Sequence, residues 1–149
     1  MAATGERDLA RPGARPSGRG HGHAARWTDA LGELLATPSA ALLDGLSACL
    51  LDCDDETRVA RLRGRAEGDV DAYLSWAAWM RRHAVDPRWM PEVIATDDGP
   101  PGMRWDRWSD WQAGDTRWRV RVADTSALTV EQVAAELVDW IAEERPSGR

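Results

Sequence analysis

Charged side chains gather at residues 50–65, in the stretch LLDCDDETRVARLRGR. An apolar run is followed by four acids and then by four arginines: Asp52, Asp54, Asp55, Glu56, Arg58, Arg61, Arg63 and Arg65. A planar guanidinium can pair with two oxygens of one phosphate, so this stripe could hold a phosphate group. The same residues could instead form a solvated helix face, whose acids favour the positive helix N-terminus. Both interpretations stay open at this point.

Composition limits the chemistry that this stretch can take part in. The 149 residues fit one domain, and the net charge of -6 argues against a nucleic-acid or membrane partner. All 19 basic residues are arginine. The absence of lysine excludes a Schiff-base lysine and any phosphate loop that depends on a lysine.

The cysteines and histidines predict no disulfide and no metal site. Cys49 and Cys53 are the two cysteines, too few for a disulfide framework and poorly spaced to bridge in an extended run. His21 and His23 give fewer ligands than a metal site needs, and His83 is expected to be structural. No segment has the length of a membrane span. These features together predict a cytoplasmic protein with free thiols.

The first half of the chain predicts a tail and then alternating elements. Residues 1–24 are rich in Gly, Pro and Arg and predict a disordered tail, and residues 25–145 are expected to form the domain. Residues 25–37 have helical periodicity that Pro38 ends. Residues 39–45 fit either a strand or a helix fragment, and the apolar run 46–54 predicts a strand buried on both faces.

The second half predicts three capped helices and a strand. Asp54 or Asp55 can cap a helix that runs to about Arg63, with Gly64 near its end, and Asp69 can cap a helix over 70–84. Residues 117–126 alternate as a strand does. A T-x-x-Q capping box then begins an amphipathic helix at residue 129. Alternating strands and helices predict an α/β fold, a layered parallel sheet with flanking helices.

Tryptophans are concentrated in an irregular insertion at about residues 87–117 and just after it: Trp89, Trp105, Trp108, Trp111 and Trp118. Such rings can seal an insertion over the sheet, or they can stack on a base, a sugar or a peptide. Residues 86–119 hold five arginines and seven acids, and this balance argues against a groove for single-stranded nucleic acid.

Two segments together resemble the small P-loop kinases of the nucleoside and nucleotide kinase group. ACLLDCDDETRVARLRGR (48–65) is similar to that group's fourth strand and following helix. RVRVADTSALTVEQVAAELVDWI (119–141) is similar to its last strand and C-terminal helix. The resemblance covers about residues 46–141. It implies an incomplete P-loop NTP hydrolase architecture.

The resemblance also implies site residues and cofactors. The lid arginines, which reach the transferred phosphates as catalytic groups, match Arg61 and Arg65, while Arg58 and Arg63 would also bind the cofactor. The loop that borders the adenine matches Asp124, Thr125 and Ser126. ATP and Mg²⁺ are the implied cofactors, and a nucleotide or small hydroxyl compound is the implied ligand. No residue of the chain is assigned as a metal ligand.

The chain departs from this family at its catalytic centre. It contains no G-x-x-x-x-G-K-[ST] loop and no lysine, and no residue matches the base that activates the acceptor. The sequence therefore predicts the C-terminal half of a small-molecule kinase that is inactive alone, either a truncated gene product or a degenerate relative. A full-length parent would transfer a γ-phosphoryl group to a nucleoside, a nucleotide or another small hydroxyl compound.

A non-catalytic binding or protein-interaction module is the alternative. The Trp-rich insertion could dock a partner, and an exposed sheet edge could pair with a strand of another protein. The direction of the tryptophan side chains discriminates here. Rings that face solvent would favour docking through the insertion, and rings that face inward would disfavour it.

Overall fold

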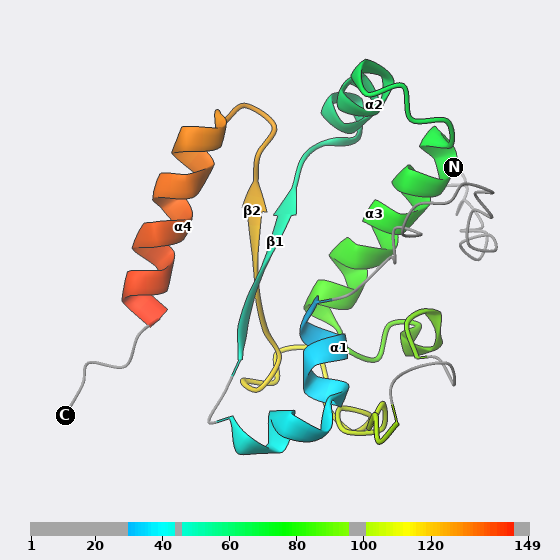
Figure 1. Ribbon diagram of the computed structural model, residues 1–149, viewed down its shortest axis with the longest axis vertical. Helices are drawn as coiled ribbons and strands as arrows, with labels where there is room; N and C mark the ends of the chain where they lie inside the picture. The colour runs from blue at the N-terminus through cyan, green and yellow to red at the C-terminus, as the bar shows by residue number, and fades with distance from the viewer. Residues whose placement is uncertain (1–29, 44–45, 96–100, 145–149) are drawn as a thin grey trace, which may run out of the picture.

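The computed structural model describes residues 30–43, 46–95 and 101–144 (Figure 1). Its elements are, in chain order, α1 (Ala30–Ala36), η1 (Pro38–Leu42), β1 (Ser47–Asp52), α2 (Asp55–Gly64), α3 (Val70–Val85), η2 (Pro91–Val93), β2 (Arg119–Asp124) and α4 (Val130–Glu144). The α/β class predicted from the sequence is confirmed. The predicted tail at 1–24 and the start of the predicted helix at 25–37 lie outside the described residues.

The two strands form a small parallel sheet. In this sheet Ala48 lies opposite Val120, and Asp52 lies opposite Asp124. The chain between the strands passes through α2, α3 and the Trp-rich segment, since parallel strands need a long crossover connection. The two strands therefore end at the same edge, which leads directly into α2 and into the loop before α4.

The prediction that the first strand is buried on both faces is wrong for this sheet. Leu51 of β1 is 49% exposed and Val122 of β2 is 48% exposed. Ala48 and Val120, by contrast, pack against the buried core. The apolar run is real, but within the described residues only part of it is covered.

The hydrophobic core lies on the side of the sheet that α1 and α3 cover. Trp108 is 1% exposed, and the rings of Trp79 and His83 stack with centroids 4.5 Å apart. Other core members come from α1 and from the segment before β2: Leu31, Leu35, Ala36, Ile94, Trp111 and Trp118. Tryptophan supplies most of the core volume in a chain that contains no phenylalanine.

Side-chain caps fix where the helices begin. The amide of Thr57 donates to Asp54 at 2.7 Å and the amide of Ala72 donates to Asp69 at 3.0 Å, so both aspartates accept from an otherwise unpaired N–H group. At α4 the amide of Thr129 donates to the Gln132 side chain at 2.8 Å, and the amide of Gln132 donates to the Thr129 hydroxyl at 3.3 Å. These caps confirm the predicted starts of α2, α3 and α4.

The structure decides between the two alternatives for residues 39–45 in favour of a helix, and it ends α2 differently from the expectation. Residues 38–42 form a 3-10 helix that begins at Pro38, so the helical alternative holds for this short run. Gly64 is still helical, and the left-handed residue that ends α2 is Ala66, with φ of 57°. The amide of Glu67 then donates to the carbonyl of Leu62 at 3.1 Å, which closes the helix end.

Helix α4 stands apart from the core. Figure 1 shows it on one side of the strand pair, with α3 and α1 on the other. Glu144 ties it to the sheet by accepting from Arg119 at 2.7 Å and from Ser47 at 3.1 Å. Yet none of its 15 residues is buried. None of the helices in the described ranges is long and apolar enough to cross a membrane.

Candidate functional site

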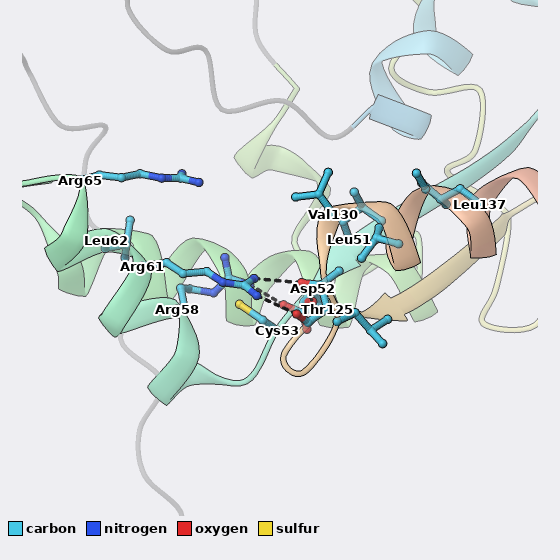
Figure 2. Close-up of a pocket in the computed structure, with 13 residues that line it drawn as sticks. Leu51, Asp52, Cys53, Arg58, Arg61, Leu62, Arg65, Thr125, Val130 and Leu137 are labelled. Carbon is cyan, nitrogen blue, oxygen red and sulfur yellow. Dashed lines mark hydrogen bonds and ion pairs between the residues drawn. The ribbon is translucent and has the colours of Figure 1, made fainter.

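A groove of about 650 Å³ opens where the two strands end, between α2 and α4. Its apolar lining comes mostly from α4 and the preceding loop, and its charged lining comes from α2 and from the end of β1 (Figure 2). The apolar residues include Leu51, Leu62, Leu128, Val130, Val133 and Leu137. Ligands of open parallel sheets bind outside the carboxyl ends of the strands, and this groove occupies that position.

Arg61 joins two segments that the resemblance to small kinases would place in one site. It donates to the Thr125 carbonyl at 2.7 Å and to the Thr125 hydroxyl at 3.1 Å. The Thr125 hydroxyl in turn donates to the carbonyl of Asp52 at 2.7 Å. A residue of α2 and a residue of the loop after β2, 64 positions apart, therefore meet at the ends of the two strands.

Asp52 is the most enclosed charge of the groove, with a side chain that is 13% exposed. It accepts from Arg58 at 2.5 Å and from Arg81 at 2.5 Å (Figure 2 draws the Arg58 contact). Burial opposes the ionised carboxylate, but hydrogen bonds from Arg81 and from the Cys53 amide, with the charges of both arginines, hold the pKa of Asp52 below its ordinary 3.8. Asp52 is thus a structural anion at the strand end.

Arg81 is a site residue that the sequence interpretation missed. From α3 it also donates to Asp55 at 2.8 Å and to the carbonyl of Cys53 at 2.7 Å. Hydrogen bonds from its guanidinium to Asp52, which outweigh its partial burial, raise the pKa of Arg81 further above its ordinary value. An acid that directly ends an apolar strand was the available signal, because a buried carboxylate requires a cation, but nothing in the sequence indicated which arginine supplies it.

The four arginines of the stripe have separate environments. Arg58 is committed to Asp52, and Arg61 to Thr125. Arg65 lines the groove and makes no side-chain hydrogen bond or ion pair within the described ranges. Arg63 is exposed and is absent from the groove lining. The structure therefore brings three of the four arginines to the groove, and Arg65 has the most freedom to meet a ligand.

The polar residues of the loop after β2 hydrogen-bond to one another and to the start of α2. Ser126 donates to Asp124 through its amide at 2.9 Å and through its hydroxyl at 2.5 Å. Both hydrogen bonds lower the pKa of Asp124. The amide of Asp54 donates to the Ser126 hydroxyl at 2.9 Å, so this loop also fixes the start of α2. In this arrangement Asp124 and Ser126 hold the backbone, and Thr125 is the member that lines the groove.

The groove lining can be compared with the groups that ATP and Mg²⁺ would need. Guanidinium groups at Arg61 and Arg65 suit phosphate oxygens. A cradle of backbone N–H groups with a lysine, which would hold the β- and γ-phosphates, has no counterpart in a chain without lysine. Within the described residues no group of three His, Cys, Asp or Glu side chains is placed to hold a metal ion. The groove thus does not fit a complete ATP and Mg²⁺ site.

The tryptophans of the insertion point inward. Trp108, Trp111 and Trp118 are buried, and Trp89 and Trp105 pack against the same core. The Trp118 indole N–H donates to the carbonyls of His83 and Ala84, at 3.2 and 3.1 Å. By the criterion drawn from the sequence, this direction disfavours docking through these rings.

The remaining sequence predictions concern the two cysteines and the two histidines near the N-terminus. Cys49 and Cys53 are both free, as predicted. His21 and His23 lie outside the described residues.

No protein-family model matches the chain, and no curated protein or solved structure is detectably similar to it.

Proposed function

We propose that this chain is the lid and C-terminal part of a kinase-like α/β fold for a nucleotide or a small hydroxyl compound, and that it is not a competent phosphotransferase by itself. Arg61 and Arg65 are the groups that would contact a phosphate. ATP and Mg²⁺ would be the cofactors of a complete site. The proposal rests on the resemblance of residues 48–65 and 119–141, and on how these two segments meet.

One observation carries the proposal. The contact of Arg61 with Thr125, at 2.7 Å, joins the candidate lid helix to the candidate adenine-side loop. Both lie at the carboxyl ends of paired parallel strands, where α/β proteins bind nucleotides. The groove beside this contact has cationic side chains on one wall and apolar side chains on the other, as a ligand with a phosphate and a flat ring requires.

The chain is expected to be inactive because its arginines have no phosphate-binding loop beside them. Positioning and charge neutralisation supply nearly all of the rate enhancement in phosphoryl transfer. Arg58 is already neutralised by Asp52, which leaves Arg61 and Arg65 to hold a triphosphate. Two guanidinium groups without a lysine or a ring of backbone N–H groups cannot align the γ-phosphoryl group with an acceptor.

The kinase-like ancestry is tested in the genomic DNA that precedes this reading frame. Translation in all frames should show an apolar strand followed by G-x-x-x-x-G-K-[ST] and a helix. A clean absence of that unit would remove the truncation hypothesis. The test requires no folded protein, so it is independent of how the chain behaves in solution.

The expected lack of competence is tested by titrating ATP and Mg²⁺ into the full chain in a calorimeter. We expect a dissociation constant no tighter than about 1 mM, because the arginines lack a phosphate loop. Micromolar affinity that Arg61→Ala or Arg65→Ala abolishes would contradict the expected weakness of ATP binding, and micromolar affinity that neither substitution changes would contradict the assigned phosphate contacts as well. Arg88→Ala is the matched control, since Arg88 is exposed and absent from the groove lining.

An interaction module remains the second candidate, through a different surface from the tryptophans. The outer edges of β1 and β2 pair with no other strand of the described chain. Helix α4 leaves Val130 80% and Val138 65% exposed. An open sheet edge and an uncovered apolar helix face both favour a partner on this side of the molecule.

A further inference from the structure

The apolar side chains that line the groove are all aliphatic. Leu51 and Leu62 lie near the ends of β1 and α2, and Val133 and Leu137 belong to α4. Among the described residues that line the groove there is no aromatic ring and no Asn or Gln side chain, although the chain contains nine tryptophans. A nucleobase is recognised by stacking on a ring or by hydrogen bonds to its edge. The described apolar wall accommodates a ring or a chain, but it has no side chain that would select a base.

The acceptor side chains of the groove are already engaged. Asp52 accepts from Arg58 and from Arg81. The Thr125 hydroxyl donates to the carbonyl of Asp52 and accepts from Arg61. The hydroxyl groups of a sugar would therefore meet no carboxylate or hydroxyl that is still unused among the described lining residues. A ligand of this groove has to be held by arginine N–H groups and by aliphatic contact.

Arginine donors remain available at one end of the groove. A guanidinium group carries five N–H donors, and Arg61 uses two of its nitrogen atoms to bond Thr125. Arg65 lines the groove and makes no side-chain hydrogen bond or ion pair within the described part of the chain. Figure 2 shows both arginine side chains extending from α2 toward the side on which Leu51 and Val130 lie. The groove thus has a positive end to which one carboxylate or phosphate group is complementary.

We propose that this groove binds a soluble aliphatic anion, with a carboxylate or phosphate head at Arg65 and an alkyl chain along α4. Val130, Ala134 and Leu137 line the groove on successive turns of α4 and offer an aliphatic track about 10 Å long. The groove volume of about 650 Å³ is typical of small-molecule sites. The head supplies an anion to Arg65, and the chain covers aliphatic side chains that water otherwise contacts.

The inference goes beyond the kinase-like proposal and does not depend on it, because it uses only the lining of the groove. A search of the genomic DNA that found no phosphate loop would leave it unaffected. The net charge of -6 opposes attraction to an anionic membrane surface, so the ligand is expected to be free in solution and not part of a bilayer.

NMR titration of the full chain with decanoate and with decyl phosphate, both below the concentrations at which they form micelles, tests the site. We expect saturable shifts of the backbone amide signals of Arg65, Val133 and Ala134, with a dissociation constant below about 1 mM. Octanoate is shorter by two methylene groups and should bind about fourfold more weakly, because a half-covered methylene contributes about half of its transfer free energy. The absence of saturable shifts, or equal binding of octanoate and decanoate, would overturn the proposal.

Three further probes separate the head, the chain and the source of the ligand. Inorganic phosphate and decyltrimethylammonium should each bind at least about tenfold more weakly than decyl phosphate, because one lacks the chain and the other has the wrong charge. Equal binding of either probe would contradict the proposal. Vesicles of phosphatidylglycerol and phosphatidylcholine should not carry the protein down on sedimentation. Sedimentation with vesicles that Arg65→Glu abolishes would show that the groove takes a membrane lipid, contrary to the proposal.

Matched substitutions locate the head and the chain. Arg65→Glu should weaken decanoate binding by about tenfold or more, because it places a like charge beside the head, whereas Arg63→Glu changes the net charge equally outside the lining and should not. Ala134→Trp should fill the groove and abolish binding, whereas Ala135→Trp, at an exposed position outside the lining, should leave it unchanged. Circular dichroism checks that all four variants are folded. A control that loses as much affinity as its partner would overturn the assigned site.

Discussion

The two sides of the strand pair differ in how far their apolar residues are buried. On the side of α1 and α3, four tryptophans from distant segments are at most 7% exposed, and they enclose a histidine that is fully buried. On the side of α4, a helix of 15 residues has no buried residue and faces a groove of about 650 Å³. The tryptophan side is a closed core, and the groove side is an open surface.

An amphipathic pattern therefore identifies a contact face of a helix but does not say what covers that face. The apolar faces of α3 and α4 both follow the helical period. The insertion before β2 folds over α3 with rings large enough to fill the space. No described segment reaches the exposed side of α4.

Removal of a ring from the closed core should have the largest effect. Trp108 is 1% exposed, so Trp108→Ala should lower the free energy of unfolding by about 3–5 kcal/mol through lost packing and a cavity. Trp140→Ala is the matched control on α4, where the ring is only partly covered. Urea unfolding followed by circular dichroism measures both. Equal losses would show that the two sides are equally complete.

Removal of the carboxylate of Asp52 at the end of β1 should have the second-largest effect on stability. Asp52→Ala leaves Arg58 and Arg81 without their shared carboxylate in a partly enclosed place, at a cost of about 2 kcal/mol in unfolding free energy. Asp106→Ala removes an acid from an exposed pair with Arg104 and should not change stability measurably. Chemical denaturation compares them. An Asp52→Ala variant as stable as its control would show that this network is dispensable.

The same network should make stability depend on pH in a defined direction. The pKa of Asp52 in the folded chain lies below the ordinary 3.8, so its contribution is fully present above that value and is lost as pH falls through the lower folded pKa. Unfolding free energies measured in urea from pH 6 down to acidic pH should therefore fall less steeply for Asp52→Asn than for the natural sequence. Parallel curves would assign the acid sensitivity to other carboxylates.

A truncation on the open side should have the smallest effect. Ile141 is 47% exposed, so Ile141→Ala should lower the free energy of unfolding by less than about 1 kcal/mol. The same substitution at Ile94, which is 2% exposed, should cost about 2–5 kcal/mol. Thermal or urea unfolding of the two variants gives the ratio directly. A large loss at Ile141 would mean that this side of α4 is covered in the folded chain.

Contacts between residues close in the sequence allowed the helix starts to be predicted. Contacts between residues far apart in the sequence could not be predicted. The caps at Asp54, Asp69 and Thr129 use contacts within three residues, so the sequence alone located the starts of three helices. The pairing of β1 with β2 and the link from Arg61 to Thr125 depend on packing between segments more than 60 residues apart.

The errors have the same physical origin. A continuous apolar run predicted a strand covered on both faces, but coverage depends on neighbours that a run does not encode. Arg81 escaped notice because it lies on the partly buried flank of α3, where an arginine next to another arginine looks like an ordinary solvated helix face. The direction of the tryptophans was likewise undecided until the segment before β2 could be seen folded over α3.

Hydrogen exchange of the full chain compares the two sides of the strand pair amide by amide. Amides of α3, which contacts both strands and the tryptophan core, should exchange slowly. Amides of α4, a helix with no buried residue, should exchange much faster. Protection of α4 equal to that of α3 would contradict the conclusion that one side is closed and the other open.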